Sequence, residues 1–138
     1  MKHAATFLFV PGDRSDRFTK AVASGAHCVI IDLEDAVQPQ AKAQARQATL
    51  AADIDWARVA VRINDATSPH FEDDRQFLRA CAASTVIVPK AESPHTVTQI
   101  RAACARDVDI IIMIETARGL ANMASLLSAP GVRRAAFG

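Results

Sequence analysis

The sequence predicts an α/β fold built on a parallel sheet, because short apolar runs alternate with segments of helical character. The runs recur about every 25 to 30 residues along the 138-residue chain, and such alternation is typical of βαβ units. Each run is continuously apolar, as in parallel strands that are covered on both faces. We expect strands at Thr6–Val10, Cys28–Ile31, Val59–Ile63, Thr85–Val88, Asp109–Ile114 and Ala135–Phe137.

Helices are expected between successive strands, and several begin or end at residues that favour helix termini. Gly25 follows the first helical segment, and Pro94 opens the fourth directly after Ser93, a good N-cap residue. Thr116 is a plausible cap for the last one. The expected helices are Ser15–Ser24, Pro39–Leu50, Phe71–Ala82, Pro94–Ala105 and Ala117–Ser128.

The regular repeat predicts a (β/α)8 barrel of the TIM type, which typically needs ~250 residues. Residues 1–138 supply the first five βα units and the start of a sixth strand, as a single partial barrel domain. We therefore expect the sequence to be a truncated part of a longer enzyme. A complete six-stranded doubly wound fold of the flavodoxin type is the alternative, made weaker by an ending in mid-strand.

The composition indicates a soluble globular protein rather than a disordered, nucleic-acid-binding or membrane protein. Half of the residues are apolar, 22% are charged and the net charge is +1. The longest apolar stretch, Ile110–Ile114, is too short to cross a bilayer. The odd cysteine count without a C-x-x-C spacing predicts free thiols in a reducing cytoplasm. We expect a cytoplasmic protein with no nucleic-acid or membrane partner.

Ionisable side chains follow the first five predicted strands, at the ends that meet on one rim of a barrel. The carboxyl ends of barrel strands carry the active site. Five successive strands that deliver such groups form a pattern, whereas any one of them alone would not. These ionisable residues are Asp13, Arg14, Asp32, Glu34, Asp35, Arg62, Lys90, Glu92 and Glu115.

The chemistry of this rim points to magnesium and a 2-oxo acid. Glu115 follows five apolar residues, so its carboxylate is held at the edge of a dry core and needs a partner. Mg²⁺ binds few protein carboxylates and completes its octahedron with water and substrate oxygens. Arg62 offers a planar fork that suits a substrate carboxylate. A metal beside this arginine would bind a 2-oxo acid and polarise its carbonyl or stabilise an enolate.

Each of these residues also has a purely structural explanation. Glu34 and Asp35 would favour the N-terminus of the next helix, and Arg62 would form a buried ion pair with Glu34, which does not exclude a substrate role. Lys90 is expected to form an ion pair at the rim. The histidines show no ligand spacing, so none is assigned to a metal.

Five motifs in order resemble the citrate lyase β-subunit group of the HpcH/HpaI aldolase and malyl-CoA lyase superfamily. The resemblance extends over nearly the whole chain, and five motifs at barrel spacing are specific at the level of the family. The motifs are Leu8–Arg14, Ile30–Val37, Val61–Asn64, Val88–Glu92 and Ile114–Gly119.

The resemblance implies roles for individual residues. Mg²⁺ would be held by Glu115 and by a second acid near the end of strand 6, a few residues beyond Gly138. Arg62 would grip the carboxylate of the oxo acid, which makes Arg62 and Glu115 the expected catalytic pair. Glu34 and Asp35 would support substrate binding, and basic residues near the first loop, such as Arg14, would meet the phosphates of CoA.

The implied activity is a carbon–carbon lyase that cleaves a 3-hydroxyacyl thioester, such as citryl-, malyl- or citramalyl-CoA, into a 2-oxo acid and an acyl thioester. The carrier is CoA or an acyl-carrier protein. Two alternatives stay open: a catalytically incomplete fragment or remnant, and an aldolase that acts on free 2-oxo acids. The complete enzyme is expected to be a homotrimer or a multiple of one, and the isolated chain to aggregate through its unpaired strand edges.

Overall fold

The strands form one six-stranded parallel sheet, and each strand pairs with its neighbours in the sequence, in the order β1-β2-β3-β4-β5-β6. The structure, a computed structural model, describes residues 4–138. The strands are β1 Phe7–Pro11, β2 Cys28–Asp32, β3 Val59–Arg62, β4 Thr85–Val88, β5 Asp109–Ile114 and β6 Val132–Phe137.

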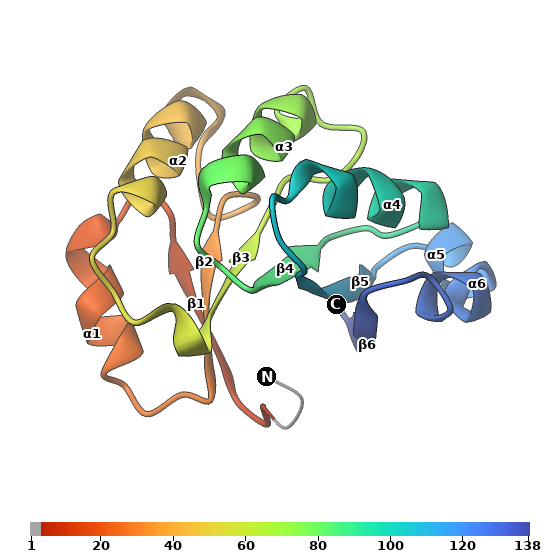
Figure 1. Ribbon diagram of the computed structural model, residues 1–138, viewed down its shortest axis with the longest axis horizontal. Coiled ribbons are helices and arrows are strands. Elements are labelled where there is room, and N and C mark those ends of the chain that lie inside the picture. The colour runs from red at the N-terminus through yellow and green to blue at the C-terminus, as the bar shows by residue number, and fades with distance from the viewer. Residues whose placement is uncertain (1–3) are drawn as a thin grey trace.

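The helices lie along one side of the curved sheet (Figure 1). Short 3₁₀ helices η1 and η2 lead directly into α1 and α2, so the expected helices Ser15–Ser24 and Pro39–Leu50 each begin with a 3₁₀ turn. The helices are η1 Ser15–Arg17, α1 Phe18–Val22, η2 Pro39–Ala41, α2 Lys42–Leu50, η3 Trp56–Arg58, α3 Phe71–Ala80, α4 Pro94–Ala103, α5 Ala117–Ala121 and α6 Met123–Leu127.

The two faces of the sheet carry two separate apolar clusters, as the alternation of side chains along a strand requires. In β5, Ile110, Ile112 and Ile114 pack under the helices in the larger cluster, whereas Ile111 and Met113 belong to the smaller cluster on the inner face. Sequential parallel strands with helices on one side are the arrangement of a (β/α)8 barrel, not of a doubly wound sheet. The predicted partial barrel is therefore confirmed.

The C-terminal elements differ from the prediction in two respects. Strand β6 begins at Val132 rather than Ala135, and a register shift between Ile110 and Ile111 accommodates an extra residue in it. Arg133 and Arg134 interrupt the apolar pattern at the start of this strand, so the apolar run alone marks only its second half. The expected helix Ala117–Ser128 is divided at Asn122, whose side-chain amide donates to the carbonyl of Glu92 in the loop after β4.

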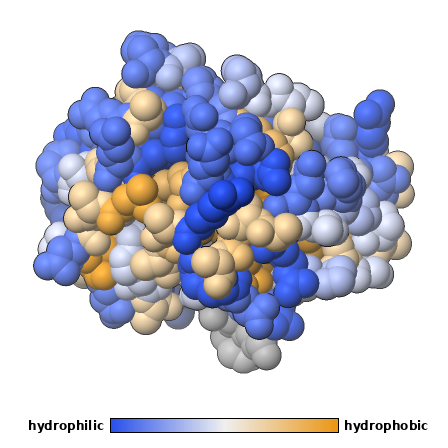
Figure 2. All heavy atoms as spheres, turned by 45° about the horizontal axis from the view of Figure 1, so that its top comes forward, coloured by the Kyte–Doolittle hydropathy of each residue, from blue (hydrophilic) through white to orange (hydrophobic). Residues whose placement is uncertain are grey.

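The outer surface is mainly polar, while the two edge strands expose large apolar side chains. In Figure 2, hydrophilic residues dominate the visible face and hydrophobic residues form an interrupted band across its middle. Phe7, Leu8 and Phe9 of β1 and Phe137 of β6 are exposed, which supports the expectation that the isolated chain aggregates. None of the helices within residues 4–138 has the length and apolar character required to cross a bilayer.

The cysteines are free thiols, as expected from their number and spacing. Cys28 and Cys81 are buried and Cys104 is half-buried. Burial raises the pKa of the Cys28 thiol to about 11, so this group stays protonated on the inner face of the sheet.

A buried carboxylate, Asp74 of α3, ties two helices to the end of β3. Its Oδ2 accepts the backbone N–H and the side-chain amide of Asn64, both at 2.7 Å, and its Oδ1 accepts Nη1 of Arg46 in α2 at 2.9 Å. The amide of Asn64 also donates to the carbonyl of Leu33 after β2. These bonds fix the chain directly beyond Arg62, at the rim where the functional residues gather.

Replacing Asp74 with Ala should lower the free energy of unfolding by about 3 kcal/mol, because Asn64 and Arg46 lose a buried acceptor. Urea denaturation of the full-length protein measures this change. Asp73 is the matched control, since it contacts the same Arg46 but its side chain is 56% exposed. Asp73→Ala should cost less than about 1 kcal/mol, and equal losses in the two variants would contradict the role given to Asp74.

Candidate functional site

The centre of the site is a buried ion pair between the last residues of two neighbouring strands. Asp32 ends β2 and Arg62 ends β3, and the two are direct partners in the parallel register. Nε of Arg62 donates to Oδ1 of Asp32 at 2.8 Å and Nη2 donates to Oδ2 at 2.6 Å. The guanidinium also lies over the ring of Phe9, 5.0 Å from its centroid. Burial opposes the positive charge, but the bonds to Asp32 outweigh it and raise the pKa of Arg62.

Glu34 lies between two cations although its side chain is only 5% exposed. Its Oε2 is 3.0 Å from Nη1 of Arg62, and its Oε1 accepts Nζ of Lys90 at 2.8 Å. Burial raises the pKa of Glu34, and the contacts with Lys90 and Arg62 act in the opposite direction. The predicted ion pair of Arg62 with Glu34 is present, and Asp32 is an additional partner.

Lys90 follows β4 and has an unusual backbone conformation, with a φ of 45°. Among the non-glycine residues described, it alone has a positive φ, and that conformation is strained for a residue with a Cβ atom. Its N–H donates to Oε2 of Glu115 at 2.8 Å, while its ammonium bonds to Glu34 and lies 3.7 Å from Oδ2 of Asp65. The expected ion pair of Lys90 at the rim is therefore present.

Glu115 directly follows β5 on the same rim. The hydrogen bond from Lys90 uses Oε2, and Oε1 lies so close to Gly138 that a Cβ atom on this glycine would come within 2.7 Å of it. Glycine at position 138 thus leaves room for the carboxylate. Within residues 4–138, no group of three or more acidic, histidine or cysteine side chains is arranged to hold a metal. One exposed carboxylate whose Oε1 makes no described hydrogen bond fits a part of a Mg²⁺ site, since this ion accepts waters and substrate oxygens as its other ligands.

The turn after β5 is packed tightly against the loop after β4. A Cβ atom on Gly119 would lie 2.5 Å from the carbonyl oxygen of Ala91, so only glycine fits. Thr116 caps α5 by accepting the N–H of Gly119 and donates its hydroxyl to Glu92. This packing holds the segments that carry Lys90 and Glu115 against each other.

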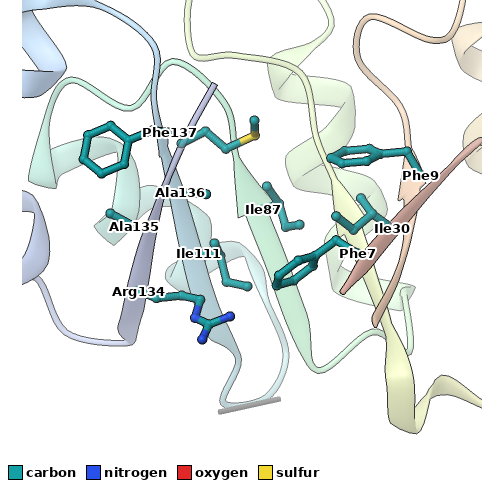
Figure 3. A pocket seen from close by; sticks show the side chains of 10 residues that line it. Phe7, Phe9, Ile30, Ile87, Ile111, Arg134, Ala135, Ala136 and Phe137 are labelled. Atoms are coloured by element: carbon teal, nitrogen blue, oxygen red, sulfur yellow. The ribbon is translucent and has the colours of Figure 1, made fainter. Parts of the chain in front are cut away.

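Two hollows lie near the functional residues, one among the loops of the rim and one on the inner face of the sheet. A polar hollow of about 270 Å³ at the rim is lined by Glu34, Asp35 and Lys90 among others. An apolar hollow of about 510 Å³ lies between β1 and β6, and Figure 3 shows the aromatic rings of β1 on one side of it and Arg134 with Phe137 on the other. Nη1 of Arg134 donates to the carbonyl of Ala4 at 2.9 Å, a contact that joins the two edges of the sheet.

The structure brings most of the predicted residues together, and it adds one that sequence reasoning missed. Arg62 and Glu34 are in contact, and Glu115 joins them through Lys90. Asp35 is exposed at the rim. The added residue is Asp32, which the sequence places at the end of the second strand but which was given no role in the site; the register of β2 with β3 sets it opposite Arg62.

Arg14 stands apart from this cluster. Its guanidinium forms two hydrogen bonds with the nearby Asp16, and its side chain is 44% exposed. The hydrogen bond and the charge of Asp16 raise the pKa of Arg14. It lies in the loop after β1 without a described contact to Arg62 or Glu115. A ligand held by those two residues would therefore reach Arg14 only through a part that lies farther away.

Known proteins resemble this chain in sequence and in fold. A "Citrate lyase subunit beta-like protein" of Mycobacterium tuberculosis is 39% identical over 123 residues, which are 89% of this chain and 43% of that protein. An "L-malyl-CoA/beta-methylmalyl-CoA lyase" of Cereibacter sphaeroides is 33% identical, over 88% of this chain and 43% of its own length. The crystal structure of CitE from M. tuberculosis with magnesium, acetoacetate and coenzyme A superposes with a TM-score of 0.88 at 37% identity, over 100% of this chain and 50% of that one.

The match extends over nearly all of the chain, but over only part of its relatives. The chain spans about half the length of the curated relatives it matches. The family model described as HpcH/HpaI aldolase/citrate lyase matches residues 5–138, which include every rim residue described above. The chain therefore belongs to the HpcH/HpaI aldolase/citrate lyase family.

Proposed function

We propose that the chain is the part of a Mg²⁺-dependent carbon–carbon lyase that carries the oxo-acid site. The enzyme cleaves a 3-hydroxyacyl thioester, such as citryl-, malyl- or citramalyl-CoA, into a 2-oxo acid and an acyl thioester. The observation that carries the proposal is the buried guanidinium of Arg62, fixed by Asp32 at the same rim as Glu115. Solved relatives that contain magnesium with oxaloacetate, or magnesium with acetoacetate and coenzyme A, support it.

Arg62 is suited to bind the carboxylate of the oxo acid. Its Nε and Nη2 hold Asp32 and its Nη1 lies near Glu34, but a guanidinium has more N–H donors than these contacts use. The bonds to Asp32 fix the plane of the fork before a ligand arrives, so that little side-chain entropy is lost on binding. The ring of Phe9, over which the guanidinium lies, also favours the positive charge.

Glu115 is the residue of this chain that would hold Mg²⁺. A second acid that follows β6, a few residues beyond Gly138, would complete the protein's share of the ligands. When bound, Mg²⁺ would polarise the oxygen of the oxo acid and favour the developing negative charge. The hydrogen bond from Lys90 fixes one carboxylate oxygen of Glu115 and leaves the other for a cation.

The reaction uses these positive groups in both directions. In condensation, the enolate carbon of the acyl thioester attacks the carbonyl carbon of the oxo acid, which Arg62 holds in place by its carboxylate. In cleavage, the substrate hydroxyl passes its proton to solvent and becomes the carbonyl of the oxo acid as the carbon–carbon bond breaks. The electron pair of that bond forms the enolate of the thioester, whose carbon then takes up a proton to give the acyl thioester. Arg62 keeps the carboxylate fixed while charge shifts between the oxygens.

The remaining parts of the proposal concern the rim and the assembly. Asp35 lines the polar hollow beside Glu34 and supports the substrate. Arg14 in the loop after β1 would meet the phosphates of CoA or of an acyl-carrier protein. The complete enzyme would be a homotrimer or a multiple of one, in which further strands cover the exposed edges of β1 and β6.

The substrate class is tested by presenting thioesters and free acids to the full-length protein. Malyl-, citramalyl- and citryl-CoA should be cleaved in the presence of Mg²⁺, and cleavage should stop when EDTA removes the metal. Cleavage of free 3-hydroxy acids at equal or higher rates would show an aldolase instead. The same assay on the 138-residue chain tests the alternative of a catalytically incomplete fragment, since turnover equal to that of a full-length relative would refute it.

Replacing Arg62 with Lys should lower kcat/KM for the oxo acid about 100-fold, because an ammonium keeps the charge but lacks the fork. Arg62→Ala should lower it about 1,000-fold or more, since the oxo acid then has no cation for its carboxylate and Asp32 is left buried without a partner. Steady-state kinetics of condensation measure both. Arg79→Ala, which removes an exposed arginine of α3, is the control. Normal turnover in a folded Arg62→Ala variant would disprove the assigned role.

Replacing Glu115 with Gln should weaken Mg²⁺ binding at least tenfold and lower turnover with it, because the amide keeps the shape but loses the charge. Titration calorimetry with Mg²⁺ measures the first effect and the lyase assay measures the second. Glu92→Gln is the matched control, because Glu92 bonds to Thr116 on the same turn and should leave Mg²⁺ binding unchanged. If Glu115→Gln binds Mg²⁺ normally, Glu115 is not a metal ligand.

A further inference from the structure

Lys90 contacts two acids of the rim, Glu115 and Glu34, through two different parts of the same residue. Its backbone N–H donates to Oε2 of Glu115 at 2.8 Å, and its ammonium donates to Oε1 of Glu34 at 2.8 Å. Glu115 stands at the end of β5, whereas Glu34 follows β2 and lies beside Arg62. Lys90 thus links the proposed metal side of the rim to the proposed oxo-acid side.

The backbone conformation of Lys90 makes this double contact possible. With a φ of 45°, the residue adopts the left-handed region, which disfavours any residue with a Cβ atom. The following N–H, of Ala91, donates to the carbonyl of Met113 in β5 at 3.0 Å. Two successive N–H groups therefore face β5, while the side chain turns across the rim to Glu34. Strain of this kind persists only where the surroundings enforce it, and it gathers at functional sites.

We propose that Lys90 is a positioning residue that fixes the carboxylates of Glu115 and Glu34 relative to each other, the first through its backbone N–H and the second through its ammonium. The inference rests on the proposed function and deepens it. The ammonium holds one oxygen of Glu34, so that only the other oxygen contacts Arg62 and the remaining N–H groups of the guanidinium are left for the oxo acid. The N–H holds one oxygen of Glu115, and the other lies next to Gly138.

The two contacts predict different effects for different substitutions. Lys90→Met keeps an unbranched stem and the N–H but loses the ammonium. In the full-length protein, pyruvate affinity at saturating Mg²⁺ should fall about tenfold, the size of one charge-assisted hydrogen bond. Mg²⁺ affinity should stay within about twofold of the wild-type value, because the N–H to Glu115 remains. Lys90→Arg should regain most of the pyruvate affinity, since it restores a donor to Glu34.

The backbone contact is tested by a pair of substitutions that differ in their tolerance of positive φ. Lys90→Val places a β-branched side chain where it is strongly disfavoured, so the N–H should leave Glu115 and Mg²⁺ affinity should fall about tenfold as well. Lys90→Gly loses the ammonium but accepts positive φ, so it should bind Mg²⁺ nearly as the wild type does and pyruvate as weakly as Lys90→Met. Circular dichroism identifies any variant that fails to fold, and the glycine variant still decides the question if the valine variant does not fold.

Calorimetric titrations with Mg²⁺ alone and with pyruvate at saturating Mg²⁺ measure these affinities, with Arg79→Met as the control for loss of an exposed cation of α3. Equal pyruvate affinity in Lys90→Met and the wild type would overturn the role of the ammonium, and equal Mg²⁺ affinity in folded Lys90→Val would overturn the role of the N–H. A wild type that binds neither Mg²⁺ nor pyruvate would instead refute the proposed function. Crystal structures of the variants then decide the positioning role by themselves, because carboxylates of Glu34 and Glu115 in unchanged positions would refute it.

Discussion

The buried pair of Asp32 and Arg62 is the interaction on which the arrangement of the rim depends. Asp32 accepts both Nε and Nη2 of Arg62 and also the backbone N–H groups of Glu34 and Ala36. One carboxylate therefore fixes the cation on β3 and shapes the loop after β2 that carries Glu34. A buried ion pair of this kind contributes little net stability, because desolvation of both charges offsets their attraction. Its effect here is orientation: the guanidinium is held in one plane at the end of an apolar inner face.

The acids around this pair outnumber the cations. Asp32, Glu34 and Asp65 face Arg62 and Lys90, so the cluster carries an excess of acidic groups before a ligand binds. A 2-oxo acid at Arg62 would add one negative charge to a largely buried site, which is unfavourable without a counter-ion. A divalent cation at Glu115 would supply such a counter-ion. The excess of acids thus gives a physical reason for metal and oxo acid to bind together on this rim.

Much of the fold and part of the site could be predicted from the sequence, because the signals were local. Continuous apolar runs such as Ile110–Ile114 indicate buried strands directly. The family motifs then indicate which functional residues stand at the ends of these strands. The break at Asn122 and the early start of β6 depend on contacts with other segments, namely with the carbonyl of Glu92 and with β5. Asp32 was overlooked for the same reason, since only the register of β2 with β3 places it opposite Arg62. The left-handed conformation of Lys90 has no signal in a residue type that normally avoids it.

The segment from Glu115 to Gly119 shows how a short motif can be explained by geometry. Glu115 directly follows β5, and its carboxylate accepts the N–H of Lys90. Thr116 must then leave the strand and cap α5, which it does by accepting the N–H of Gly119. Because α5 starts so early, its first turn meets the carbonyl of Ala91, and only a residue without a Cβ atom fits there. The acid, the cap and the glycine are therefore required at these spacings by a single constraint, the close packing of the loop after β4 against the turn after β5.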